Sequence, residues 1–202
     1  LHGARGGNGI ASLSTRPGTG TETIVDSVAI SGSANASLPR SSTRLLYATA
    51  PLADTLHISG TTRVTLRVAS SRPAANLSVW LVTLPYDSTA IGSQGHLGVV
   101  TRGWADIQNH KSLTSGGDYR SKAAGEPLTP GRFYDVTFSL EPDEQIIPAG
   151  KQLAVMIMSS DREFTLWPSP GTELTVDLAK SSFTIPIAGG NAALTNARAL
   201  VR

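Results

Sequence analysis

Two stretches of this chain are apolar at almost every position, and a third alternates between apolar and polar side chains. Residues 77–84 read LSVWLVTL and residues 153–158 read LAVMIM. Between residues 63 and 68, Val and Leu alternate with Arg and Thr. A continuous apolar run of this length is typical of a strand buried on both faces, whereas strict alternation is typical of a strand with one wet face. We therefore expect a sheet with at least two interior strands.

Further β-rich segments follow one another along the chain, each bounded by Pro, Gly or Ser. They are residues 21–30, 45–47, 56–59, 133–140, 164–167, 174–178 and 183–187, and a strand that starts with Leu97, Val99 and Val100. Only residues 191–200 could form a helix, so the crossover helices that a parallel sheet requires are missing. The pattern predicts an all-β fold, a jelly-roll β-sandwich of the galactose-binding-domain-like kind.

The two ends of the chain differ from its middle. Residues 1–20 are rich in glycine and poor in apolar side chains, which indicates a connecting arm from a preceding domain. We expect the sandwich to span residues 21–187 and a C-terminal tail to span residues 188–202. The start of the chain has neither an initiator Met nor a signal-peptide pattern, so we expect a fragment of a longer protein.

Composition excludes several classes of function. The net charge is only +2 and the basic residues are scattered singly, whereas nucleic-acid binding needs a clustered basic surface. The chain has no cysteine, and no apolar run approaches the roughly 18 residues of a membrane span. None of the four histidines has a partner at metal-ligand spacing, so we expect no metal or other cofactor. The low charged fraction, 16%, favours a secreted protein and leaves a cytoplasmic location open.

We find no catalytic motif and expect no catalytic residue. The nearest approach to the G-x-S-x-G elbow of α/β-hydrolases is residues 91–95, IGSQG, which lack the first glycine and a following helix. We therefore interpret Ser93 as a turn residue. The glycines near the N-terminus lack the Lys-Ser/Thr of a phosphate-binding loop.

A long polar run at residues 97–118 is the best candidate for a functional surface. We predict that Trp104 anchors a loop whose side chains Asp106, Asn109, His110 and Lys111 meet a neighbouring domain or border the approach of substrate. Trp104 could equally be a core residue, because Trp is common both in cores and at interfaces. His110 could act as an acid or base, but with no nucleophile nearby an interface contact is the better interpretation.

Other aromatic and sulfur-containing side chains lie in or beside expected strands. We expect Trp80 and Trp167 in the core, and Met156 and Met158 on one face of a buried strand. His57, between Leu56 and Ile58, should lie on the wet face of its strand. These positions need no cofactor to explain them.

Several segments, taken in order, resemble one known family. They are LLYATAPLADTLHISG at 45–60, TTRVTLRVASS at 61–71, NLSVWLVTLP at 76–85, VVTRGWADIQNHKSL at 99–113 and PGRFYDVTFSLEPDEQIIPAGKQLAVMIMSSD at 130–161. Residues 21–187 resemble the C-terminal β-sandwich domain of the Xaa-Pro dipeptidyl-peptidases, in the wider group of cocaine-esterase-like hydrolases. The run TRGWADIQN at 101–109 is the most specific part and favours the peptidase branch.

This resemblance implies a non-catalytic role. In the family, an α/β-hydrolase domain carries the Ser-His-Asp chemistry that releases Xaa-Pro dipeptides, and no residue here matches its motifs. The implied partner is that catalytic domain of the same parent protein, and a homo-oligomer is left open. The alternative is a carbohydrate-binding jelly-roll module of a secreted enzyme, disfavoured because aromatic residues are only 5% and mostly in expected strands.

Overall fold

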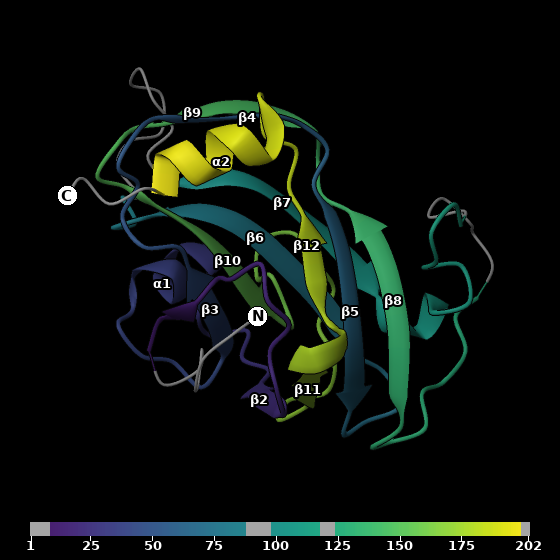
Figure 1. Cartoon of the computed structure of the whole chain (residues 1–202). Helices are drawn as coiled ribbons and strands as arrows, with labels where there is room; N and C mark the ends of the chain where they lie inside the picture. The colour runs from purple at the N-terminus through teal and green to yellow at the C-terminus, as the bar shows by residue number, and fades with distance from the viewer. Residues whose placement is uncertain (1–8, 88–97, 118–123, 199–202) are drawn as a thin grey trace.

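The computed structural model describes residues 9–87, 98–117 and 124–198. Its strands form two main layers, with a short pair of strands and a C-terminal helix closing one end (Figure 1). The expected all-β class is confirmed. Ser93 lies outside the described residues, as do both ends of the 97–118 run.

The first sheet contains both apolar runs of the sequence. Its order is β1 (Ala11–Ser12), β3 (Arg44–Ala48), β10 (Gln152–Met158), β6 (Asn76–Leu84) and β7 (Val99–Asp106). All neighbours are antiparallel except β1 and β3. Strands β10 and β6, the segments whose sequences are apolar on both sides, both lie in the interior of this sheet, so this prediction is confirmed.

The second sheet is built around β5 (Arg63–Ser70), the strand with strict alternation. One edge of β5 pairs with β8 (Phe133–Ser139), and the other pairs with β11 (Glu173–Asp177) and β12 (Ser182–Thr184). Strand β2 (Thr21–Val25) pairs with the free side of β11. Outside both sheets, β4 (Leu56–Gly60) pairs with β9 (Asp143–Ile147).

The main core lies between the two sheets. Inward side chains of β6 and β10, such as Val79 and Val155, meet those of β5 and β8, such as Leu66 and Val136. Helix α2 (Gly190–Arg198) covers the end near β4 and inserts Ala197 into the same core (Figure 1). Burial of this apolar surface is the main source of stability.

The outer face of the first sheet carries a second apolar cluster, which includes Trp80, Met156 and Met158. Helix α1 (Gly32–Ser37) covers part of it. A Cβ on Gly32 would lie 2.3 Å from the Trp80 ring, so only glycine allows this close approach. The expected burial of Trp80 and the shared face of the two methionines are confirmed.

A buried arginine connects α1, β3 and the segment before β1. Arg44 is fully buried and donates hydrogen bonds to the backbone carbonyls of Asn35, Leu38 and Gly9. Desolvation by burial lowers the pKa of its guanidinium to about 10. The guanidinium satisfies carbonyls at the end of α1 that have no partner within the helix.

Several local predictions were wrong. Residues 164–167 form an exposed turn rather than a strand, and Trp167 is 57% exposed rather than buried. A helix that was not expected, α1, lies between the segments predicted as strands at 21–30 and 45–47, and the expected strand at 21–30 ends at Val25. Strand β9 was not anticipated, because its sequence DEQII has little alternation. The predicted helix near the C-terminus is confirmed as α2.

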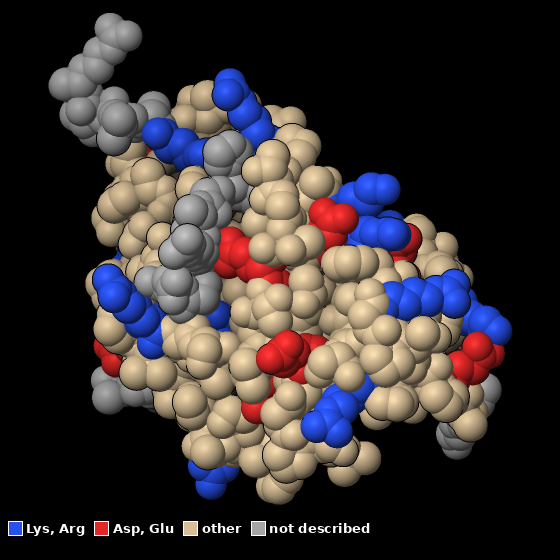
Figure 2. All heavy atoms as spheres, turned by 90° about the horizontal axis from the view of Figure 1, so that it is seen from below, with Lys and Arg blue, Asp and Glu red and all other residues tan. Residues whose placement is uncertain are grey.

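The outer boundaries of the domain stay predictions, although both ends contribute packed residues. Within the predicted arm, Ala11 is 7% exposed and pairs with Tyr47 of β3. In the part of the chain that the structure describes, no helix is long and apolar enough to cross a membrane. On the face shown in Figure 2, acidic and basic side chains are interspersed and separated by wide uncharged areas.

Candidate functional site

The last residue of β7 and the segment after it include four of the five residues predicted for a functional surface. Asp106 is the last residue of β7, and its Oδ1 accepts a hydrogen bond from the Gln108 amide at 2.9 Å. This bond begins the short 3-10 helix η1 (Ile107–Asn109), and the carbonyl of Asn109 accepts amide hydrogen bonds from Ser112 and Leu113. Asp106 and Asn109 therefore shape the local backbone.

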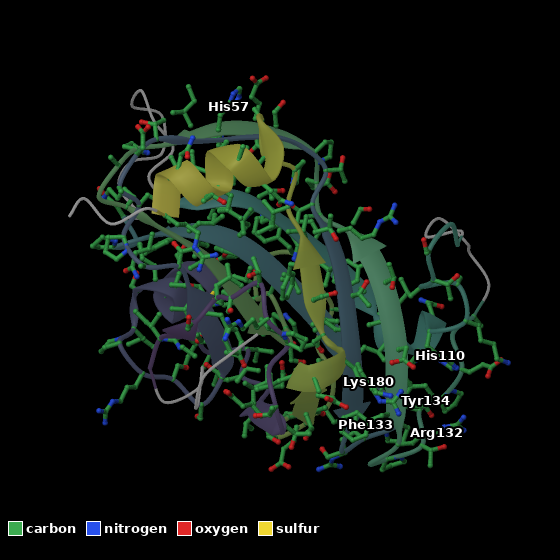
Figure 3. All side chains as sticks on the ribbon, in the orientation of Figure 1. His57, His110, Arg132, Phe133, Tyr134 and Lys180 are labelled. Carbon is green, nitrogen blue, oxygen red and sulfur yellow. The ribbon has the colours of Figure 1, made fainter. Side chains whose placement is uncertain are left out.

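His110 and Lys111 contact residues of their own domain. The His110 ring packs on the Tyr134 ring of β8 with centroids 4.6 Å apart, and Figure 3 shows the two side chains together. The Thr129 amide donates a hydrogen bond to the Tyr134 hydroxyl, and this bond lowers the pKa of Tyr134. Lys111 pairs with Glu126 and holds the pKa of that carboxyl below its usual value.

Trp104 faces a different group of residues. It lies on the outer face of β7, and its indole N–H donates to Oδ2 of Asp161 at 2.9 Å. The indole N–H of Trp80 donates to the same oxygen at 2.9 Å. Asp161 is fully buried, and among the described residues it forms no ion pair and its Oδ1 has no hydrogen-bond partner.

Near this carboxylate, two aromatic rings form a stack and an arginine side chain lies against them. The Trp104 and Phe164 rings are stacked with centroids 5.4 Å apart and an angle of 23° between their planes. The Arg102 guanidinium lies 3.8 Å from the Phe164 ring centroid and also approaches the rings of Trp80 and Trp104. This is cation–π geometry, and within the described residues no carboxylate lies within ion-pair distance of Arg102.

The loop after β10, residues 161–167, presents apolar side chains to solvent. Phe164 is 48% exposed, Leu166 is 89% exposed and Trp167 is 57% exposed. Beneath them the backbone is fixed, because the amides of Phe164 and Thr165 donate to the Asp161 carbonyl and Asn76 donates to the Leu166 carbonyl. We call this segment the 161–167 loop.

One hollow borders the stack of Trp104 and Phe164, and a second lies elsewhere on the domain. One of ≈ 530 Å³ lies beside the stack and is lined by Trp80, Tyr86, Arg102, Glu141 and Phe164, among others. Another of ≈ 580 Å³ lies between the N-terminal segment, β12 and α2, with Leu13, Phe183 and Leu194 in its lining and Arg16, Lys180 and Arg198 around it.

The described side chains do not assemble a nucleophile with a base. His57 lies at the other end of the molecule from His110 and pairs with Glu144 at 2.9 Å (Figure 3). Neither histidine is hydrogen-bonded to a Ser or Thr hydroxyl in the described part of the chain. No group of three or more metal-ligating side chains is found within residues 9–87, 98–117 and 124–198.

Sequence reasoning missed the importance of Asp161 and of the exposed side chains that follow it. The β-rich composition of residues 164–167 predicts a strand that the structure does not contain. A signal against that strand was present, because the charged triplet at 161–163 and two prolines at 168 and 170 leave only four residues between them. The interior position of Asp161 depends on distant indole groups and has no local signal.

Comparison with protein families places nearly the whole chain in one of them. Residues 5–199 match the family described as the X-Pro dipeptidyl-peptidase C-terminal non-catalytic domain. A relative from Rhodopirellula baltica, provisionally named a Xaa-Pro dipeptidyl-peptidase, is 45% identical over 84% of this chain. One from Streptomyces avermitilis with the same name is 31% identical over 95% of this chain. The matched segment covers only 26% and 32% of these two relatives.

Solved structures of larger hydrolases contain the same fold. An α-amino acid ester hydrolase matches 90% of this chain with a TM-score of 0.61 and 17% identity, over 36% of its own length. An aminopeptidase from a marine sediment Thaumarchaeota archaeon matches 85% of this chain with a TM-score of 0.62 and 16% identity, over 34% of its own length. With the match over residues 5–199, the chain belongs to the X-Pro dipeptidyl-peptidase C-terminal non-catalytic domain family.

Proposed function

We propose that this chain is the C-terminal domain of a serine exopeptidase that releases Xaa-Pro dipeptides from peptide N-termini. The domain packs on an α/β-hydrolase domain of the same parent protein and shapes the approach to its active site. The observation that carries this proposal is the family match over residues 5–199. The small share of the relatives that this chain covers supports a catalytic domain elsewhere in the parent.

The arrangement of side chains supports a structural rather than a chemical role. The best-placed histidine for acid–base work, His110, packs on Tyr134, and no described hydroxyl lies in hydrogen-bond contact with it. Acyl transfer requires a nucleophile and a base within hydrogen-bond reach. The domain therefore contributes stability and shape, and the chemistry belongs to its partner.

The test is hydrolysis of Ala-Pro-p-nitroanilide by two purified proteins, the parent and the 202-residue chain alone. We expect the parent to release p-nitroaniline and the chain alone to release none. A serine-directed inhibitor should abolish turnover by the parent. Turnover by the chain alone that titrates with the inhibitor would contradict the non-catalytic role, and an inactive parent would contradict the proposed substrate.

A further inference from the structure

The 161–167 loop concentrates exposed apolar area that a free surface rarely carries. Among the described residues, six large apolar side chains are exposed, and three of them are Phe164, Leu166 and Trp167. The other three, Ile10, Leu38 and Ile146, lie on separate elements. Single exposed apolar residues are ordinary, but a contiguous group marks an interaction surface.

The loop is held in place by contacts with buried groups. Asp161 accepts hydrogen bonds from two indoles, and the Ser160 amide donates to Oδ1 of Asp26 at 2.7 Å. Asn76 of β6 donates to the Leu166 carbonyl and so fixes the loop at its exposed end. A surface ordered in advance loses little conformational entropy on binding, which favours tight association.

The chemistry of the surface resembles the centre of a protein–protein interface. Aromatic and arginine side chains dominate such centres, and here the Phe164 ring stacks on Trp104 while the Arg102 guanidinium lies against both rings. Exposed Arg162 and Glu163 supply polar groups next to it. Because Arg102 has no described carboxylate partner, the complementary surface should offer an apolar pocket with an acidic group near it.

We propose that the 161–167 loop, together with Arg102 and Trp104, is the surface on which the hydrolase part of the same parent protein docks. This inference rests on the proposed function. The length of the relatives indicates which partner occupies this surface. The segment that matches this chain is 26% of the Rhodopirellula relative, so about three quarters of that protein lies outside it. A tethered partner is present at high effective concentration, so it outcompetes a second copy for the same surface.

The experiment is hydroxyl-radical footprinting of the intact parent, with each side chain compared between native and urea-unfolded protein. Ile146 is the internal reference, because it is exposed and isolated on β9. Leu166 is 89% exposed in this domain against 63% for Ile146, so an uncovered Leu166 should be the less protected of the two. We expect Leu166 and Trp167 to be protected at least about fivefold more than Ile146.

A pair of variants of the parent gives a second measurement. Leu166→Asp places a charge in the proposed contact and should abolish the excess protection of Trp167. The matched control, Ile146→Asp, adds the same charge at an isolated position and should leave that protection unchanged. Both variants should keep the fold of the domain, because the altered side chains project into solvent.

The outcomes separate this proposal from the proposed function. If the parent hydrolyses Ala-Pro-p-nitroanilide but Leu166 is no better protected than Ile146, the docking surface is wrong and the function stands. If the parent is inactive on that substrate but Leu166 and Trp167 are protected, the docking surface stands and the function is wrong. Protection that disappears on dilution, or that needs an added oligosaccharide, would assign the surface to a second copy or a glycan and overturn the proposal.

Discussion

Two loops of this domain distribute their polar and apolar side chains in opposite ways. In the segment after β7, the apolar residues Ile107 and Leu113 are buried, and the polar groups bond to their own domain. In the 161–167 loop, the charged residue Asp161 is buried and the apolar residues Leu166 and Trp167 face solvent. The polar groups of the first loop thus have partners within the domain. The second loop exposes apolar surface, and burial of that surface against a partner would be favourable.

The comparison shows that charged and polar residues in the sequence do not by themselves identify an interaction surface. Lys111 and Asp106 suggested a partner surface because they are charged, yet each already has a partner within the domain. Leu166 and Trp167 were assigned to a strand because they are apolar. An exposed apolar group is the more informative observation, and only the fold reveals it.

Replacement of Asp161 by Ala should have the largest effect on stability. It leaves the buried indole N–H of Trp80 and the partly buried one of Trp104 without an acceptor, so we expect a loss of about 3–5 kcal/mol in the free energy of unfolding. Urea unfolding followed by tryptophan fluorescence measures this loss. Asp161→Asn keeps an acceptor oxygen and should lose less than half as much; equal losses would show that the two indole bonds contribute little.

Ile107→Ala should test the first loop. Ile107 is 1% exposed, and truncation of a buried Ile typically costs about 2–4 kcal/mol. The matched change in the second loop, Leu166→Ala, removes an exposed side chain and should change the stability of the chain by less than about 0.5 kcal/mol. Thermal unfolding of both variants compares them directly, and a similar loss in each would abolish the contrast between the loops.

Trp104→Phe should have an intermediate effect. It keeps an aromatic ring against Phe164 but removes one hydrogen bond to a buried carboxylate, which is worth about 1.5–3 kcal/mol. Trp167→Phe, a change of the same size at an exposed position, should be nearly neutral. Urea unfolding midpoints distinguish the two. If Trp104→Phe were also neutral, Trp80 alone would suffice to hold Asp161.

The smallest effect should come from the ion pair of the first loop. Lys111 lowers the pKa of Glu126 in the folded chain. The ion pair therefore stabilises the fold above the ordinary glutamate pKa of about 4.3, and this stabilisation is lost as the pH falls. Both side chains are largely exposed, so Lys111→Met should lower Tm only slightly at pH 7. The difference from the unaltered chain should disappear as the pH falls through the lowered pKa of Glu126; a constant difference would have another cause.

The sequence was sufficient to identify the central strands of the two sheets but not the exposed apolar surface. Alternation identified β5 and continuous apolar runs identified β6 and β10, because burial on one or both faces dictates which residues those strands can carry. Trp104 was recognised as important, but its bond to Asp161 joins residues 57 apart and depends on tertiary structure. The same holds for α1, whose six residues lack an apolar period and are fixed by contact with Trp80 and Arg44.

The hydrogen bond from Arg44 to the Gly9 carbonyl has a practical consequence for anyone who prepares this domain. A recombinant version trimmed to start at residue 21 would remove that carbonyl and the strand that pairs with Tyr47. The guanidinium would then face an opening at the edge of the sheet, and the exposed edge of β3 would invite intermolecular pairing. A version that starts upstream of residue 9 keeps both contacts, so we expect it to give the more monodisperse product.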